Sequence, residues 1–159
     1  MKENTCCFFG HRTIYETEEL RTKITEAVEG LITDENVDTF LFGSKSEFDR
    51  LCLELVTKLK EKYPHVKRIY VRAEFPYISD DYLTYLLKSY DETYYPEKLL
   101  GSGRAAYVER NYEMINNSKY CIVYYDEQNA PSARKSGTRI ALDRAIEMGR
   151  KIMIFPSLL

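Results

Sequence analysis

The stretch TCCFFGHR, Thr5–Arg12, joins an apolar run to an abrupt polar ending. Residues 5–9 have the continuous apolar character of a strand that is buried on both faces, and Gly10 bounds it. His11, one of only two histidines in the chain, follows at once with Arg12 beside it. The pattern predicts a strand whose carboxyl end presents these two side chains either in a solvated turn or to a bound phosphate or carboxylate.

The same alternation of apolar strands and amphipathic helices continues through the chain. Apolar residues at helical spacing follow Thr17 and Phe48, and Ser79 and Ser136 have the character of helix caps. Strands are predicted at 5–9, 38–43, 66–71, 93–95, 119–125 and 151–155, with helices between them. Because buried strands joined by crossover helices form parallel sheets, we expect one α/β domain over residues 1–159. That domain should be Rossmann-like and doubly wound, with a mainly parallel sheet and helices on both faces.

Composition narrows the classes of function. The chain has 159 residues, 44% of them hydrophobic and 30% charged, and a formal net charge of −2. This balance fits a soluble domain with no overall field for nucleic acid, so a nucleic-acid partner is not expected. No apolar run approaches a membrane span, and the N-terminal stretch lacks the apolar region of a signal peptide. We therefore expect a cytoplasmic protein with no membrane partner.

The four cysteines, Cys6, Cys7, Cys52 and Cys121, lie in predicted strands or on an apolar helix face. They lack the spacing of metal ligands, and Cys6 and Cys7 should point to opposite sides of the sheet. We interpret them as buried free thiols in a reducing compartment. No metal site is predicted.

Polar and glycine residues recur where the predicted strands end. Ligands of doubly wound sheets bind beyond the carboxyl ends of the strands, where the strand order switches. Gly10, His11 and Arg12 follow the first strand, Gly43 and Ser44 the second, and residues 72–74 the third. Asp126 and then residues 136–138 come after the strand at 119–125, so the chain delivers these groups to one rim.

Ser136, Gly137 and Thr138 open the last helix. The free amides and positive dipole of a helix start suit an anion, Gly137 allows close approach, and Thr138 adds a hydroxyl. The alternative is an ordinary helix cap without a ligand.

Two other pairs also have a structural and a functional interpretation. Asp49 follows Ser46 by three positions, which favours a capping pair over a carboxylate that binds a ribose hydroxyl. Arg110 and Asn111 lie on a predicted helix, where they face either the rim or solvent. No Ser/His/Asp or Cys/His arrangement is present, and neither are the glycine-rich nucleotide motifs GxGxxG and GxxxxGK[ST].

Several stretches together resemble the SLOG superfamily, which is named for the DNA-processing protein DprA/Smf and the LOG-type proteins. CCFFGHR resembles the strand and GHR opening of its small, single-domain, YpsA-like bacterial branch. GSKSEFD matches the Gly-x-x-x-Gly-x-Asp motif at Gly43 and Asp49, with Glu47 in place of the second Gly. RNYEMINNS and the SGT that opens the last helix match two further motifs, with Lys119 in place of the usual Asp.

The resemblance implies a Rossmann-like domain that binds or senses a nucleotide-related ligand at the rim, with a possible homodimer. In this reading Gly137 and Thr138 hold phosphate, Arg12 and Arg110 pair with its charge, and Asp49 binds ribose. No cofactor is identified.

The LOG-type relatives cleave the N-glycosidic bond of nucleoside monophosphates. Such cleavage needs a carboxylate that positions and activates water, but Ala141 stands where their motif has Glu. A nucleotide hydrolase that uses Asp49 or Glu74 is therefore the alternative reading. Binding of single-stranded DNA, as in DprA, is a weaker third possibility because the chain has no basic stripe. The polar loop 126–135 is compatible with a lid over the ligand.

Overall fold

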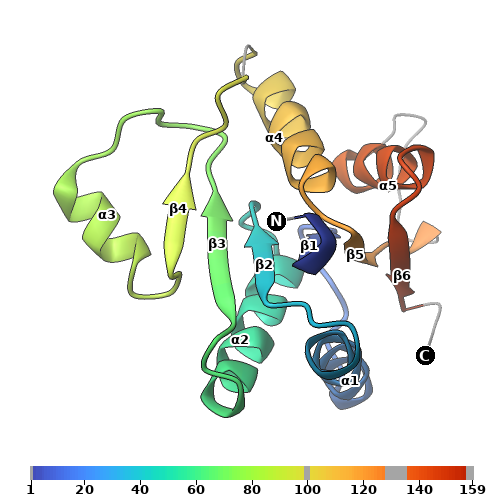
Figure 1. The fold of residues 1–159 in the computed structure, drawn as a ribbon. Helices are drawn as coiled ribbons and strands as arrows, with labels where there is room; N and C mark the ends of the chain where they lie inside the picture. Colours follow the sequence, from blue (N-terminus) through green and yellow to red (C-terminus); the bar gives the residue numbers. More distant parts are fainter. Residues whose placement is uncertain (1, 99–100, 128–135, 157–159) are drawn as a thin grey trace.

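Figure 1 shows the computed structural model, which describes residues 2–98, 101–127 and 136–156. A short 3₁₀ turn, η1, covers Lys2–Asn4. The strands are β1 (Thr5–Gly10), β2 (Thr39–Phe42), β3 (Lys67–Val71), β4 (Glu92–Tyr94), β5 (Tyr120–Tyr124) and β6 (Lys151–Phe155). The helices are α1 (Glu18–Asp34), α2 (Glu47–Lys62), α3 (Asp80–Leu86), α4 (Arg104–Asn116) and α5 (Gly137–Glu147).

The strands form a single six-stranded sheet in the order β4-β3-β2-β1-β5-β6. Every neighbouring pair is parallel, which confirms the predicted doubly wound α/β class. The chain moves outward from β1 to β4 and then returns to place β5 on the other side of β1. The strand order therefore switches between β1 and β5, where a ligand site is expected.

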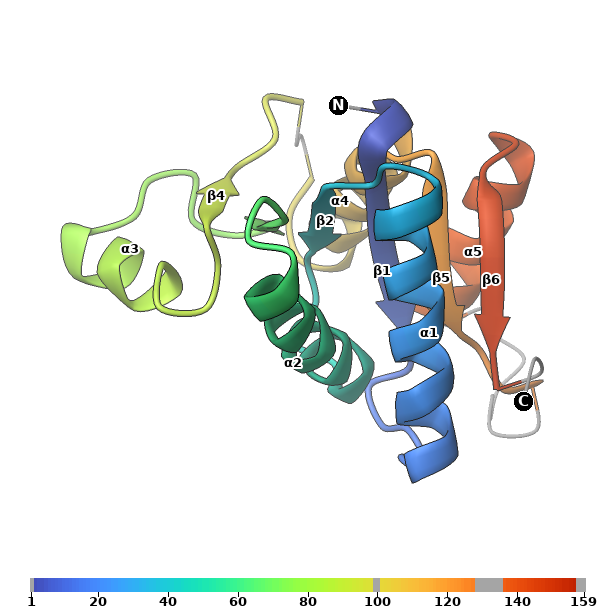
Figure 2. The same ribbon diagram turned by 60° about the horizontal axis from the view of Figure 1, so that its bottom comes forward.

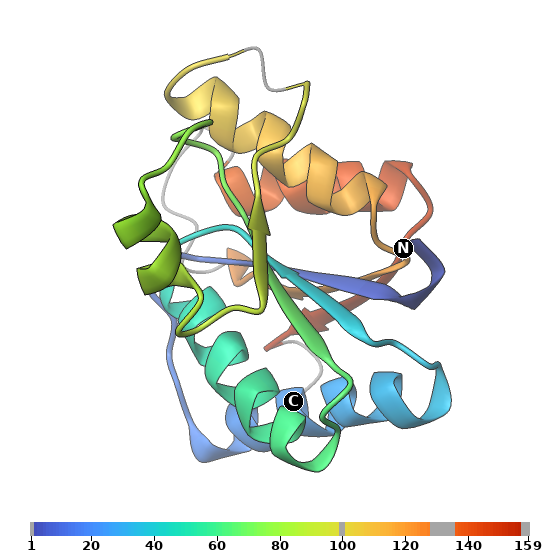
Figure 3. The same cartoon turned by 60° about the vertical axis from the view of Figure 1, so that its left-hand side comes forward.

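Helices cover both faces of the sheet. Figure 3 shows α1 and α2 below the strands and α4 and α5 above them, and Figure 2 views the α1 and α2 face. Alternate side chains of β1 point to opposite faces of the sheet. Cys6 and Phe8 pack in the core under α1 and α2, and Cys7 packs in the core under α4 and α5. All four cysteines are buried and free, as predicted. The strands β1, β2 and β5 are central, which explains their continuous apolar character.

Hydroxyl side chains fix the starts of four helices. Thr17, Ser46, Ser79 and Ser136 cap α1, α2, α3 and α5, and each accepts a hydrogen bond from the amide three residues later. This confirms the caps expected at Ser79 and Ser136. The structure describes no helix with the length and apolar character that a membrane span requires.

The segment between β3 and β4 departs most from the prediction. The helix expected to run from Ser79 to about Tyr90 ends at Leu86, which is its only buried residue. Figure 1 shows α3 standing beyond the edge strand β4 and away from the other helices. A helix with so little buried surface gains little from packing, which explains its short length.

Candidate functional site

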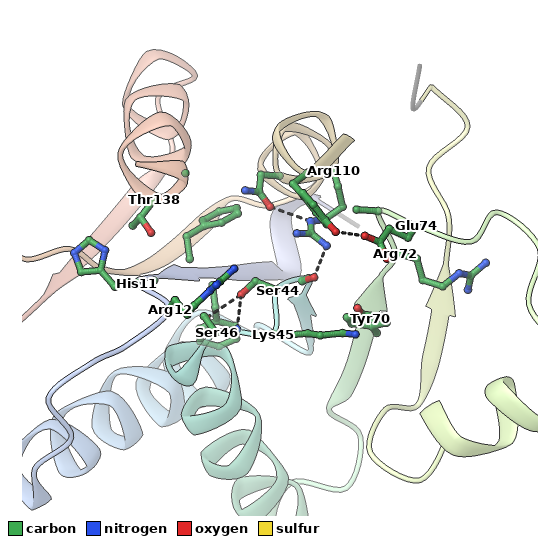
Figure 4. Close-up of a pocket in the computed structure, with 18 of the residues that line it drawn as sticks. His11, Arg12, Ser44, Lys45, Ser46, Tyr70, Arg72, Glu74, Arg110 and Thr138 are labelled. Carbon is green, nitrogen blue, oxygen red and sulfur yellow. Dashed lines mark hydrogen bonds between the residues drawn. The ribbon is translucent and has the colours of Figure 1, made fainter. Parts of the chain in front are cut away.

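A cavity of about 720 Å³ opens at the carboxyl ends of β1, β2 and β3, beside the start of α5 and one face of α4 (Figure 4). It lies beside the switch in strand order, where doubly wound sheets hold their ligands. All of the predicted site residues except Asp49 line it: Gly10, His11, Arg12, Gly43, Ser44, Arg110, Asn111, Ser136, Gly137 and Thr138. The structure thus brings together residues that are up to 128 positions apart in the sequence, the separation of Gly10 and Thr138 (138 − 10).

The start of α5 forms one end of the cavity. The Ser136 hydroxyl accepts a hydrogen bond from the Arg139 amide at 3.1 Å, so the cap predicted as the alternative to an anion site is present. Within the described residues, the amides of Gly137 and Thr138 donate to no other group. The helix cap and an anion site are therefore compatible, because Ser136 caps the Arg139 amide and leaves the amides of Gly137 and Thr138 at the cavity.

His11 is held in place by backbone and ring contacts. Its Nε2 accepts a hydrogen bond from the Asp126 amide at 3.0 Å, so the neutral ring carries its proton on Nδ1. The ring centroid lies 5.3 Å from that of Tyr125. These contacts leave Nδ1–H as the donor that His11 can offer to a ligand.

Arg12 is exposed, and its backbone is tied to the start of α2. Its carbonyl accepts a hydrogen bond from the Glu47 amide at 2.9 Å, and the Glu47 carboxylate accepts one from the Ile14 amide at 3.1 Å. Glu47 thus fixes the loop that carries Arg12. The Arg12 guanidinium has no salt-bridge partner among the described residues, so it can contact a ligand.

Asp49 supports the site from behind and does not line the cavity. Its Oδ2 accepts hydrogen bonds from the amides of Gly43 at 3.1 Å and Ser44 at 3.0 Å. The capping half of the prediction is confirmed, because the Asp49 amide donates to the Ser46 hydroxyl at 3.1 Å. The carboxylate, however, reaches neither the helix start nor the cavity. Asp49 is therefore not placed to bind a ribose hydroxyl, because it is only 3% exposed and its Oδ2 already accepts the Gly43 and Ser44 amides.

Burial makes the charged form of the Asp49 carboxylate unfavourable. Its Oδ1 is buried and has no hydrogen-bond partner among the described residues. Burial raises the pKa of Asp49 from 3.8 to about 6, although the two amides and the nearby Arg110 oppose the rise.

Arg110 braces the ends of two strands. Its Nη1 donates to the carbonyls of Gly43 and, at 3.3 Å, Val71, and its Nε donates to the Asn111 side chain at 3.0 Å. Burial lowers the pKa of this guanidinium, and Asp49 is the main group that opposes the shift. Arg110 thus holds the rim together and also presents positive charge at the cavity.

Two glycines of the site are required by close packing. A Cβ at Gly10 would lie 2.4 Å from Cβ of Phe48, and one at Gly43 would lie 2.8 Å from Cδ of Arg110. Only a residue without a side chain lets α2 and Arg110 approach the strands this closely.

Besides residues 72–74, the cavity contains residues that the sequence did not assign to the rim: Phe8, Phe9, Lys45, Ser46, Tyr70, Phe75, Tyr82 and Tyr107. Tyr107 carried a usable signal, because it precedes Arg110 by three positions and so shares its helix face. Residues 72–74 follow a strand and were recognised as part of the rim. Phe75 lies between a predicted strand and a predicted helix, and Tyr82 lies in the helix expected from Ser79; neither was assigned to the rim.

The charge of the cavity is opposite to that of the whole chain. Arg12, Lys45, Arg72 and Arg110 line it, whereas Glu74 is the one carboxylate among its described lining residues. None of the four cations forms a salt bridge within the described part of the chain. A positive hollow in a chain of net charge −2 favours an anionic ligand.

Comparison of the chain with protein-family models and with curated proteins found no match. Across residues 2–98, 101–127 and 136–156, no group of three or more His, Cys, Asp or Glu side chains is arranged to hold a metal ion. The predicted lid, 126–135, falls mostly on residues 128–135, which lie outside the described part of the chain.

Proposed function

We propose that the protein binds a nucleotide or a nucleotide-derived molecule in this cavity. The observation that carries the proposal is that four cationic side chains, none of them in a salt bridge within the described structure, line the same cavity as the start of α5. A helix start and guanidinium groups are the usual partners of phosphate in proteins.

Different parts of the cavity would bind different parts of the ligand. The amides of Gly137 and Thr138, the Thr138 hydroxyl and Arg12 receive the phosphate. His11 adds the Nδ1–H donor beside them. Ser44 lies between this end and β3, where a ribose hydroxyl can reach its side chain. Arg110 contributes positive charge while it supports the rim.

A ligand screen tests the proposal directly. Nucleoside mono- and diphosphates and nucleotide sugars are added to the purified protein, and the melting temperature is measured. A ligand that binds only the native state raises the melting temperature by mass action. The dissociation constant of each such ligand is then measured by calorimetry. The absence of any shift across the panel would contradict the proposal.

Arg12→Gln gives the residue-level test, with Arg50→Gln as its matched control. Both arginines are exposed, but Arg50 lies on α2 outside the cavity. Loss of a charge-assisted hydrogen bond to phosphate should weaken binding about tenfold in the Arg12 variant. Equal affinities of the two variants would show that Arg12 does not contact the ligand.

Nucleotide hydrolysis is a second candidate, and Glu74 is the observation that favours it. Glu74 is the carboxylate lining the cavity, and it accepts a hydrogen bond from the Tyr107 hydroxyl. Asp49 is unsuited to act as a base on a ligand because its carboxylate faces the backbone of residues 43 and 44. Release of free base or ribose phosphate, abolished in Glu74→Gln, would support hydrolysis. Binding without product would leave the binding module as the function.

A further inference from the structure

The cavity ends at β3 in a cluster of aromatic rings. Tyr70 from β3, Phe75 from the segment that leads into α3, Tyr82 from α3 itself and Tyr107 from α4 all line it. We call these four residues the aromatic cluster. Figure 4 shows His11 and Thr138 at the opposite end, beside α5, with Ser44 and Arg110 in between. The aromatic rings therefore lie at the β3 end of the cavity, and the start of α5 lies at the other end.

Phe75 combines an unusual backbone conformation with an exposed ring. Its φ is 61°, in the left-handed region that a bulky residue rarely adopts, and its side chain is 55% exposed. The Arg72 side chain secures this conformation: Nε donates to the Phe75 carbonyl at 3.2 Å, and Nη1 donates to the Thr93 hydroxyl at 3.0 Å. Backbone strain that the surroundings maintain is concentrated at functional sites.

Side-chain contacts orient two further rings of the aromatic cluster. The Tyr82 ring meets the Phe75 ring edge to face, with centroids 6.1 Å apart. The Tyr107 ring lies under the Arg110 guanidinium at 5.6 Å, and its hydroxyl donates to Glu74. Tyr107 is 41% exposed, so its ring retains open surface. The rings are thus oriented by their neighbours, and part of their surface remains accessible to a ligand.

We propose that the aromatic cluster is the subsite for the base of the nucleotide. This inference rests on the proposed function and adds the orientation of the ligand to it. From β1 to β3 the rim spans two strand spacings, about 10 Å, which leaves room for a ribose between a phosphate at α5 and a planar base at β3. Base stacking on aromatic side chains tolerates any base, so the aromatic cluster selects a nucleotide over a sugar phosphate.

The test compares ligands that differ only in the base. AMP, GMP, CMP and UMP are titrated into the full chain, and ribose 5-phosphate serves as the probe without a base. At least one nucleotide should bind about fivefold or more tightly than ribose 5-phosphate. Phe75→Ala should remove most of this advantage, whereas Phe75→Tyr, which keeps the ring, should retain it.

Tyr77→Ala is the matched control. Tyr77 is 93% exposed in the same segment, but it does not line the cavity. It should leave both the nucleotide affinity and the melting temperature unchanged. Tyr107→Phe should also keep the preference for a base, since the ring remains when the hydroxyl is lost.

The outcomes separate the two proposals. If ribose 5-phosphate binds as tightly as every nucleotide, or if Phe75→Ala binds nucleotides like Tyr77→Ala, the base subsite is overturned while phosphate binding stands. If neither the nucleotides nor ribose 5-phosphate bind the wild-type protein, the proposed function itself is overturned. A Phe75→Ala protein that melts as Tyr77→Ala does, yet loses the preference for nucleotides, supports the subsite.

Discussion

Asp49 and Arg110 hold the two polar ends of the same residue, Gly43. The Asp49 carboxylate accepts from the Gly43 amide, and the Arg110 guanidinium donates to the Gly43 carbonyl. Both side chains are buried, and each shifts the titration of the other toward its charged form. The loop that begins at Gly43 and carries Ser44 and Lys45 into the cavity is thus fixed by two opposite charges behind it.

The buried carboxylate should make stability depend on pH. Because burial raises the pKa of Asp49 from 3.8 to about 6, the folded state holds its proton more tightly than the unfolded state does. The associated stability is fully present below pH 3.8 and is lost as the pH rises through about 6. This shift corresponds to about 3 kcal/mol in the free energy of unfolding. Urea titrations between pH 3.5 and 7 measure it.

Asp49→Asn isolates the contribution of this residue from those of other acids. The amide oxygen of Asn can still accept from the Gly43 and Ser44 amides, but it does not titrate. The difference in unfolding free energy between wild type and variant should therefore change most between pH 4 and 6. Parallel curves over that range would show that Asp49 titrates normally.

Three glycine substitutions should rank by the space around them. Gly10→Ala should destabilise the protein by about 1–3 kcal/mol, since the new Cβ would lie 2.4 Å from Cβ of Phe48. Gly43→Ala should also destabilise it, because it displaces Met114 and Arg110, and should weaken ligand binding. Gly30→Ala in α1 is the control. A Cβ added at Gly30 would have no atom within 4 Å outside its own helix backbone, so Ala should stabilise the helix by about 1 kcal/mol. Thermal unfolding of the three variants checks this order.

The sequence was sufficient to predict the fold because its core signals are strong and local. The continuous apolar run in β1 and the capped amphipathic helices each specify one element, and the rule for parallel sheets assembles them. The same rule predicted that residues 10–12, 43–44 and 136–138 would meet at one rim, which the structure confirms. Here local pattern and topology agree.

Two features of the site depend on contacts that no local pattern encodes. The spacing of Ser46 and Asp49 is typical of a capping pair, but Asp49 instead bonds the loop before the helix, because burial places its carboxylate under Gly43. Phe75 has a positive φ, for which sequence rules expect Gly or Asn. Its conformation is set by the long-range contact of Arg72, and so it was visible only in the folded chain.

The thiols should be unreactive in the native protein. Burial raises the pKa of Cys6, Cys7 and Cys52, which lowers the fraction of reactive thiolate. Cys7 and Cys121 lie with their sulfurs 3.4 Å apart between two central strands, where a reagent has no access. A thiol-reactive chromophore should label no cysteine quickly at pH 8, and all four after unfolding in urea. Fast labelling of the folded protein would indicate that the sheet opens locally.

A double-mutant cycle should detect the coupling of Asp49 and Arg110. Arg110→Met removes the donors to Gly43 and Val71 and leaves the Asp49 charge buried without its cation, so we expect a loss of about 3 kcal/mol at pH 7. In the Asp49→Asn background the loss should be smaller by about 1 kcal/mol, because no buried charge is left behind. Urea unfolding of the four proteins measures this difference.

The pH dependence of the same cycle distinguishes charge from packing. At pH 4.5, below the raised pKa of Asp49, the carboxyl is largely protonated, and the coupling to Arg110 should shrink toward zero. Arg150→Met provides the control cycle with Asp49→Asn, since Arg150 bonds the Ile115 carbonyl on α4 and does not line the cavity. Its effect should add to that of Asp49→Asn at both pH values. A coupling of Asp49 and Arg110 that is the same at pH 4.5 and pH 7 would mean that the two side chains communicate through the packing of Gly43 and not through their charges.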